Sequence, residues 1–164
     1  MTPGPVTLIL MRHGVAEGPD LCDTDEARAL TTDGLAAAGL AARGLVALGI
    51  HPDVVVSSPL IRCRQTAKLV AEAAGCPMEQ DDRLKPGMTT HDVLDMVAEH
   101  PDARVIIMCT HQPGLSHALA DLTGCGLIGF KRPGAAVIRL DSPRPGGGSL
   151  VAILPPRILR GAAG

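Results

Sequence analysis

The chain has 164 residues, 46% of them apolar, which is enough for a single globular domain over residues 1–164 with a sizeable core. Its 15 basic and 17 acidic residues give a net charge of −2 without a basic run, which argues against nucleic acid or an anionic membrane as a partner. Five scattered cysteines without a CxxC pair exclude the common zinc and dithiol motifs.

The first expected element is a strand at Val6–Met11. This run is apolar, rich in branched side chains, and typical of a strand buried on both faces. It is also too short for a signal peptide or a membrane span. We therefore expect a cytoplasmic protein.

A helix is expected next. Apolar side chains recur there at helical spacing, at Leu35, Ala38, Ala42 and Leu45. Thr31 or Thr32 would cap its N-terminus, and Gly49 would stop it. The short apolar segment 53–58 then predicts a second strand.

Ser58 and Pro59 have the pattern of a helix cap followed by a first-turn proline. They predict a helix that runs to Gly75 and carries Arg62 near its N-terminus. A weaker helical pattern covers residues 90–99.

The second half of the chain contains Ala103–Cys109, a further buried strand, and a helical segment at 114–124. Two apolar segments, 135–141 and 149–155, are joined by the turn-rich SPRPGGG and should pair as a hairpin. Residues 155–164 are expected to form a loose or surface-docked tail.

Strands that alternate with helices indicate an α/β fold, here a three-layer α/β/α sandwich with a mainly parallel central sheet. In such sheets ligands bind beyond the carboxyl ends of the strands. Arg12 and His13 directly follow the first strand, Arg62 follows the second by one turn, and His111 follows the strand that ends at Cys109. We expect these four side chains to share one pocket.

Such a group of side chains suits a phosphoryl group. Guanidinium forks bind phosphate oxygens in pairs, and helix N-termini add backbone donors. One imidazole can attack phosphorus while the other donates a hydrogen bond to an equatorial oxygen. Gly14 would let the backbone turn sharply and approach the phosphate. Because grouped carboxylates are lacking and the pocket would repel a cation, we expect no metal ion and no cofactor.

Three motifs carry a family resemblance: LILMRHGVAE with its RHG sequence, SSPLIRCRQTA, and IIMCTHQPGLSHAL. In this order they resemble the histidine phosphatase superfamily, also called phosphoglycerate mutase-like, over nearly the whole chain. The resemblance implies a phosphoglycerate mutase-like fold with His13 as the nucleophile that forms a covalent phosphohistidine. It also implies that Arg12, Arg62 and His111 form the phosphate pocket.

The short length and the stretches RALTTDG and LKPGMTTHDVLDMV resemble the small phosphohistidine phosphatases of this superfamily. That resemblance implies a substrate with phosphohistidine on a signalling or phosphocarrier protein. In this subgroup an arginine before the LTT segment reaches the phosphate, which corresponds to Arg28. A surface arginine that caps a turn would give the same pattern.

One departure from the superfamily concerns the acid that protonates the leaving group. Members that act on phosphate esters carry a glutamate before the third helix, whereas DDRLKPGMTT offers Asp81 and Asp82. General acid catalysis contributes roughly a hundredfold to ten-thousandfold, so an ester phosphatase would need this group. An imidazole leaving group, with an unperturbed pKa of about 6.5, needs it much less. Glu17 and Asp20 could supply a proton, or could be solvated loop charges.

The leading hypothesis is therefore a metal-independent phosphohistidine phosphatase. The nearest alternative is a phosphatase of small phosphate esters with the same mechanism, and a less favoured one is a non-catalytic phosphate-binding module. The sequence leaves open whether Arg28, Glu17 or Asp82 reaches the pocket. It also leaves the physiological substrate and the oligomeric state open, although we expect a monomer.

Overall fold

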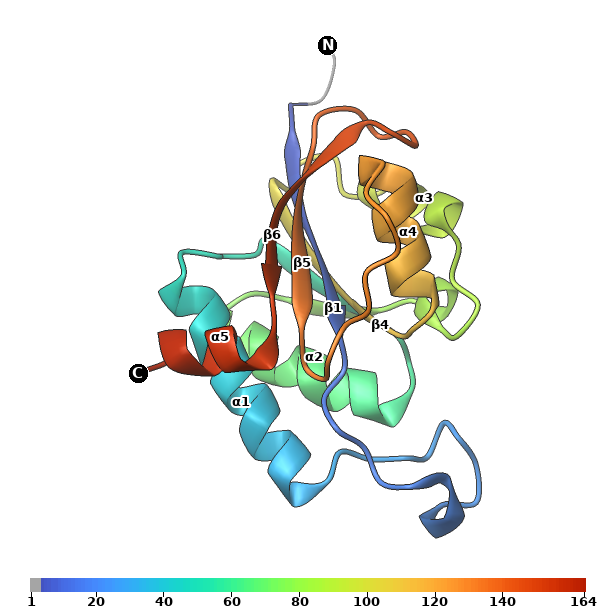
Figure 1. The fold of residues 1–164 in the computed structure, drawn as a ribbon, viewed down its shortest axis with the longest axis vertical. Coiled ribbons are helices and arrows are strands. Elements are labelled where there is room, and N and C mark those ends of the chain that lie inside the picture. The colour runs from blue at the N-terminus through green and yellow to red at the C-terminus, as the bar shows by residue number, and fades with distance from the viewer. Residues whose placement is uncertain (1–3) are drawn as a thin grey trace.

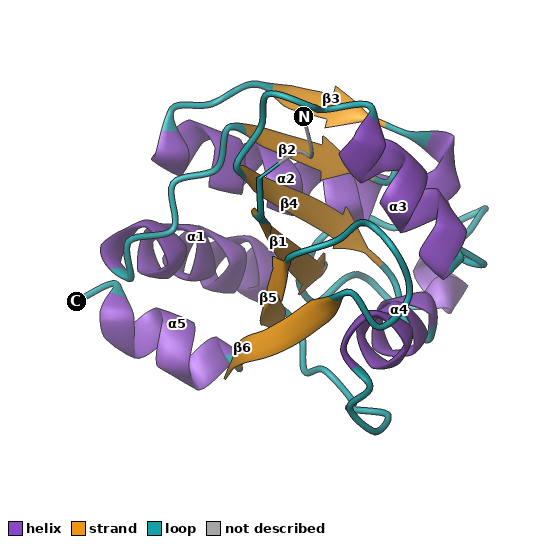
Figure 2. Ribbon diagram, turned by 90° about the horizontal axis from the view of Figure 1, so that it is seen from above, coloured by secondary structure: helices purple, strands orange, loops and turns teal. Residues whose placement is uncertain are grey.

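The computed structural model describes residues 4–164 as a sheet between two layers of helices (Figures 1 and 2). The strands are β1 (Val6–Arg12), β2 (Val54–Ser57), β3 (Met78–Gln80), β4 (Val105–Thr110), β5 (Ala135–Leu140) and β6 (Gly148–Leu154). The helices are α1 (Thr32–Ala47), α2 (Ile61–Ala74), α3 (Thr90–Ala98), α4 (Gly114–Thr123) and α5 (Pro156–Ala162), with short 3-10 turns at Pro19–Leu21 and Asp82–Leu84.

The strand order in the sheet is β3-β2-β4-β1-β5-β6. The first four of these strands are parallel, and β5 and β6 form the expected antiparallel hairpin at one edge. The prediction of a three-layer sandwich with a mainly parallel sheet is confirmed. Strand β1 lies in the middle of the sheet, so both of its faces must be apolar.

Two cores fill the spaces between the layers. Leu8 and Leu10 of β1 pack with α3 and α4, whereas Ile9 and Met11 pack on the opposite face with α1, α2 and α5. Figure 2 shows the two groups of helices on opposite sides of the sheet. This alternation explains why the whole of β1 is apolar rather than every second residue.

One expectation for α1 and one for α2 are wrong. Thr31 caps α1 as expected, with its hydroxyl accepting a hydrogen bond from Gly34 N at 2.9 Å, but Leu35 is exposed rather than part of the core. Helix α2 begins at Ile61, and Ser58 is not its N-cap. The Ser58 hydroxyl instead points to His111, at 2.8 Å from its Nε2.

Two further elements escaped the sequence analysis. The edge strand β3 has only three residues and a mixed polar pattern, so no periodicity identifies it. The C-terminal segment is docked, one of the two expected alternatives, but as a helix: it forms α5, whose Leu159 is fully buried against α1. None of the helices in the described residues is long and apolar enough to span a membrane.

The contact between α1 and α5 depends on Gly44. A Cβ at this position would lie 2.0 Å from the carbonyl oxygen of Leu159, which is backbone and cannot rotate away. A Cβ at Gly39, on the same helix, would meet only the end of the Arg43 side chain at 3.7 Å. Glycine at 44 is therefore required by packing, and glycine at 39 is not.

We predict that Gly44→Ala lowers the free energy of unfolding by about 1–3 kcal/mol, the usual cost of overpacking, because α5 must move away from α1. The control Gly39→Ala should be neutral or raise it by up to about 1 kcal/mol through helix propensity. Urea unfolding followed by circular dichroism measures both. Equal effects of the two variants would show that the close approach of α5 is unimportant for stability.

Candidate active site

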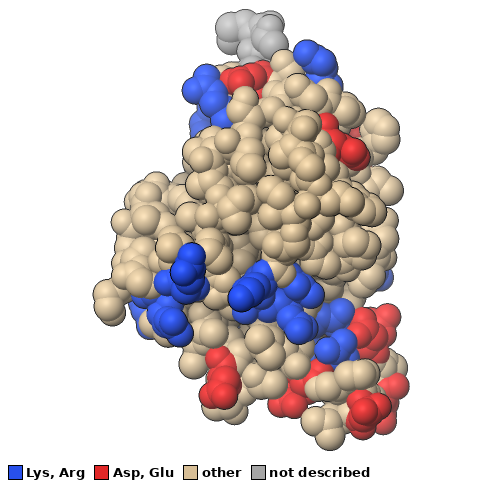
Figure 3. All heavy atoms as spheres, in the orientation of Figure 1, with Lys and Arg blue, Asp and Glu red and all other residues tan. Residues whose placement is uncertain are grey.

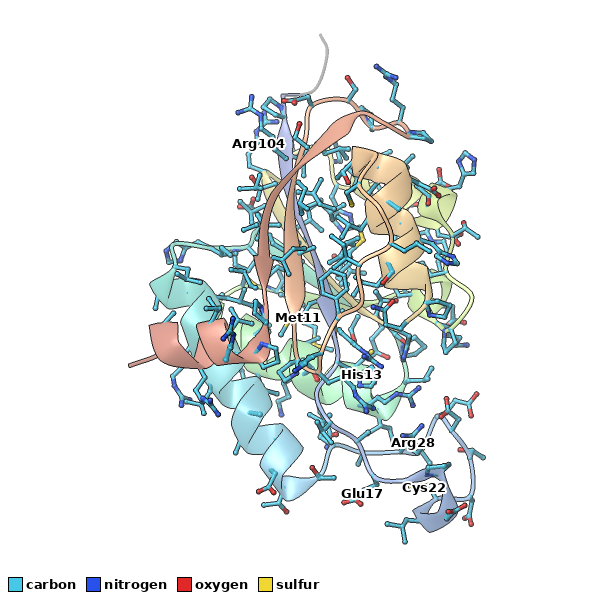
Figure 4. All side chains as sticks on the ribbon, viewed as in Figure 1. Met11, His13, Glu17, Cys22, Arg28 and Arg104 are labelled. Carbon is cyan, nitrogen blue, oxygen red and sulfur yellow. The ribbon has the colours of Figure 1, made fainter. Side chains whose placement is uncertain are left out.

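The register of the sheet brings the two predicted histidines together. Strands β1 and β4 are parallel neighbours, with Arg12 opposite Thr110. His13 and His111 each come one residue later, so both leave the sheet at the same edge. Their ring centroids are 5.3 Å apart, and both side chains are buried. Figure 4 shows His13 just beyond the end of β1.

The tautomer of His13 is fixed by its two neighbours. Its Nδ1 lies 2.7 Å from the carbonyl oxygen of Gly14, which can only accept, so Nδ1 carries the proton. Its Nε2 accepts a hydrogen bond from Nε of Arg62 at 3.3 Å. Burial, together with the nearby His111, Arg62 and Arg12, lowers the pKa of His13 to about 3. The ring is thus a neutral imidazole with a lone pair on Nε2 near neutral pH.

Arg62 lies between the two imidazoles. It belongs to the first turn of α2 and is 5% exposed. Besides its contact with His13, its NH2 lies 3.4 Å from Nδ1 of His111. The opposite side of the guanidinium is bound by Asp25, as NH1 donates to the main-chain oxygen and NH2 to Oδ2.

Two buried side chains contact the Nε2 atom of His111. Its Nε2 lies 2.8 Å from Oγ of Ser58 and 3.5 Å from Sγ of Cys63. Burial opposes ionisation of the Cys63 thiol, but a hydrogen bond with Cys109 and the nearby His111 outweigh burial and lower its pKa. With Nε2 engaged in this way, Nδ1 of His111 is the nitrogen on the side of Arg62 and His13.

Arg12 supplies the second guanidinium. Its NH1 donates to the main-chain oxygen of Phe130, and its backbone N–H donates to Gly134 O at 2.8 Å. Among the described residues its Nε is the buried side-chain nitrogen that has no hydrogen-bond partner. Burial, then the nearby Arg132, lowers the pKa of Arg12. A buried donor without an acceptor fits an anion as ligand.

Gly14 has a different environment from the one expected. Its amide N–H donates to Oγ1 of Thr66 at 3.0 Å, and that hydroxyl donates to Arg62 O at 2.8 Å. A Cβ at Gly14 would lie 3.2 Å from both Gly34 O and a methyl of Leu30. The small residue therefore serves close packing of the loop on α1, and its amide is already engaged within the protein.

Arg28 lies on the loop side of His13 in Figure 4, at the rim of the site. Its NH1 contacts Oδ1 of Asp25 at 2.9 Å, and its Nε donates to Glu17 O at 2.7 Å. The structure thus connects Arg28 to Arg62 through one carboxylate. Direct contact of Arg28 with a phosphate stays a prediction.

The aspartates before α3 have other partners. Asp81 accepts hydrogen bonds from Arg83 through both oxygens, and these lower the pKa of Asp81. Asp82 is highly exposed and lies 3.3 Å from Nζ of Lys85. Neither carboxyl group has a contact with the four residues of the pocket among the hydrogen bonds and ion pairs of the described chain.

Three residues around the pocket were not singled out from the sequence: Asp25, Cys63 and Thr66. Ser58 was noticed only as a helix cap. The strand-end rule could have found Ser58, because it directly follows β2 at the same edge of the sheet. No comparable signal separates Asp25 from Asp23 and the other acids of its loop.

The surroundings of the pocket are asymmetric in charge. Figure 3 shows Lys and Arg gathered across the lower half of the face drawn in Figure 1, with Asp and Glu on the loop below them. Beside the pocket, an open cleft of about 480 Å³ is lined by Arg12 and by Gln112, Leu127, Phe130 and Lys131. In residues 4–164 no group of three or more His, Cys, Asp or Glu side chains could hold a metal ion.

The chain is similar in sequence to known proteins. Residues 8–86 match the family model of the histidine phosphatase superfamily (branch 1). An uncharacterized protein of Picosynechococcus sp. is 34% identical over 147 residues, covering 80% of this chain and 88% of its own length. A chloroplastic protein of Arabidopsis thaliana is 29% identical over 143 residues, covering 80% of this chain and 65% of its own.

The fold also matches solved structures. The protein histidine phosphatase SixA in complex with tungstate is 24% identical, with a TM-score of 0.85 and coverage of 94% of this chain and 99% of that one. A Nakamurella multipartitia protein assigned as a phosphohistidine phosphatase SixA is 26% identical, with a TM-score of 0.80 and coverage of 93% and 97%. With its RHG motif at the end of β1, the chain belongs to the histidine phosphatase superfamily and has a SixA-like fold.

Proposed function

We propose that this protein is a phosphatase that removes phosphate from phosphohistidine on a protein through a covalent phosphohistidine on His13. The observation that carries the proposal is the state of His13. Its Nε2 lone pair lies beside Arg62, while its Nδ1–H is held by Gly14 O. A neutral imidazole among cationic side chains is a nucleophile poised to meet an anion.

In the first step Nε2 of His13 attacks phosphorus, and the bond between phosphorus and the substrate nitrogen breaks. Arg12 and Arg62 balance the charge of the phosphoryl oxygens, and Nδ1 of His111, when protonated, donates to an equatorial oxygen. Gly14 O stabilises the positive charge that develops on the attacking ring. The leaving imidazole keeps the electron pair of the broken bond; it departs as a neutral ring when its distal nitrogen already carries a proton, and otherwise takes a proton from solvent.

In the second step a water molecule attacks the phosphohistidine. The bond between phosphorus and Nε2 breaks, inorganic phosphate leaves, and the water proton passes to solvent. His13 returns to its neutral form with Nδ1 still bound to Gly14 O. We infer that water enters from the open cleft lined by Arg12 and Gln112, which are next to His13 and His111 in the chain.

The leaving group is inferred from the acids around the pocket. Asp81 is bound by Arg83 and held ionised, and Asp82 pairs with Lys85 at the surface. An alkoxide leaving group would need a proton from such an acid, whereas an imidazole leaves without it. The open cleft also leaves room for a phosphorylated side chain that projects from a protein surface.

The covalent intermediate can be trapped. After brief mixing with a radiolabelled phosphohistidine peptide and a quench in base, we expect label on the protein that is stable in base and lost in acid. His13→Ala should abolish both the label and turnover, because it removes the nitrogen that attacks phosphorus. His51→Ala, which changes an exposed histidine between α1 and β2, should label like the wild type. Turnover by the wild type without label would contradict the covalent route.

The pKa of His13 predicts how stability depends on pH. In the folded chain His13 binds a proton only near pH 3, whereas in the unfolded chain it binds one near pH 6.5. The unfolded state thus holds more protons between these values, so folding loses stability as pH falls below about 6.5. The loss is about 2 kcal/mol between pH 7 and pH 5. Urea unfolding in phosphate-free buffer should show a shallower pH dependence for His13→Asn than for the wild type and for His117→Asn. Parallel curves would refute the neutral buried state.

The leaving group can be tested with paired peptides of one sequence that carry phosphohistidine or phosphoserine. We expect kcat/KM to favour phosphohistidine by at least about a hundredfold, the scale of missing general acid catalysis. A preference for phosphoserine or for small esters would replace the substrate assignment with that of an ester phosphatase. Inorganic phosphate release measures both reactions.

A further inference from the structure

The loop between β1 and α1 places a carboxylate against the central arginine of the pocket. We propose that Asp25 is a positioning residue that fixes the guanidinium of Arg62 for phosphate binding and couples it to Arg28. This inference rests on the proposed function, because it assigns Asp25 a part in binding the phosphoryl group. The two hydrogen-bonding edges of the Arg62 guanidinium have different partners, Asp25 on one and the two histidines on the other.

A guanidinium has two edges that can each bind a pair of acceptors. The NH1/NH2 edge of Arg62 is taken by Asp25: NH1 donates to the main-chain oxygen at 2.8 Å and NH2 to Oδ2 at 3.0 Å. The Nε/NH2 edge faces Nε2 of His13 at 3.3 Å and Nδ1 of His111 at 3.4 Å. These two contacts are long for hydrogen bonds.

A phosphoryl group bound between the two imidazoles would therefore meet the Nε/NH2 edge. It can take over the two long contacts and form a paired, charge-assisted interaction there. Asp25 holds the other edge, so it does not occupy the position of the phosphate. Its effect is to fix the plane of the guanidinium, which then presents the Nε/NH2 edge toward the pocket.

The same carboxylate also reaches Arg28, the arginine of this loop. Its Oδ1 contacts NH1 of Arg28 at 2.9 Å, so each oxygen of Asp25 binds a different guanidinium. The hydrogen bond from Arg28, with a further contribution from Arg62, lowers the pKa of Asp25 and keeps it ionised. Arg28 and Arg62 are thus brought together although they come from a loop and a helix.

The loop is held in place by its main chain as well. Ile61 N, at the start of α2, donates to Glu26 O at 3.2 Å, and Ala27 N donates to the Thr24 hydroxyl at 3.2 Å. The Asp25 side chain is 52% exposed, and a pair of exposed charges alone would contribute little. The main-chain contact to Arg62, whose guanidinium is buried, makes the arrangement more specific than a surface ion pair.

The direction in which phosphate affinity changes distinguishes a positioning role of Asp25 from a purely electrostatic one. Removal of a negative charge beside an anion site strengthens anion binding if the charge acts only through its field. Removal of a residue that orients Arg62 weakens binding instead. Asp23 lies on the same loop, is exposed, and makes no side-chain hydrogen bond or ion pair within the described residues, so Asp23→Asn is the matched control.

We therefore propose to measure the Kd of inorganic phosphate by calorimetry for the wild type, Asp23→Asn, Asp25→Asn, Asp25→Ala and Asp25→Glu. Phosphate binding should weaken by about tenfold or more in the Asn and Ala variants, the scale of losing a hydrogen bond to a charged group. Asp23→Asn should bind as tightly as the wild type or slightly more tightly, and Asp25→Glu should recover part of the loss. Unfolding midpoints are recorded alongside to verify that each variant is folded.

Coupling to Arg28 is tested by a double-mutant cycle. Arg28→Ala combined with Asp25→Ala should weaken phosphate binding by less than the product of the two single effects, because both changes break one linkage. Phosphate affinity in the Asp25 variants equal to or tighter than that of Asp23→Asn would overturn the proposal. Wild type that binds phosphate but forms no labelled intermediate would instead contradict the proposed function, and leaves the ranking of Kd values intact.

Discussion

The parallel register between β1 and β4 is the constraint on which the rest of the site depends. It sets Arg12 opposite Thr110, and thereby places His13 and His111 side by side at one edge of the sheet. A shift of one residue would turn each side chain of β1 to the other face and would exchange the two cores. The alternation of Leu8 and Leu10 with Ile9 and Met11 therefore protects the geometry of the site as well as the core.

The electrostatics of the pocket follow from burial. Arg62 is buried between two imidazoles, and a buried positive charge favours neutral rings beside it. Burial, with these charges, keeps His13 unprotonated, and the same charges suit a phosphoryl group as ligand, as the proposed function requires. Asp25 supplies the negative partner that Arg62 needs inside the protein, and it does so from the edge of the guanidinium that faces away from the rings.

Helix α1 connects the site to the C-terminal end of the chain. Near its start, Gly34 lies under the loop that follows His13, where a Cβ would be 2.0 Å from Val15 O. Near its end, Gly44 receives α5 at an equally close distance. Two glycines thus allow a loop and α5 to pack closely against α1, in spite of the lower helix propensity of glycine.

Much of this protein follows from local patterns in its sequence. Apolar runs of strand length, the 3.6-residue period of α1 and the strand-end position of His13, Arg62 and His111 are sufficient for the fold class and for the main side chains of the pocket. Contacts between residues that are far apart in the chain are determined only by the tertiary structure. Asp25 and Arg62 are 37 residues apart, and Ser58 and His111 are 53 apart, so no periodicity reports their contact. For the same reason the docking of α5, the short strand β3 and the tautomer of His13, with its lone pair on Nε2, come from packing and hydrogen bonding, which a linear pattern does not contain.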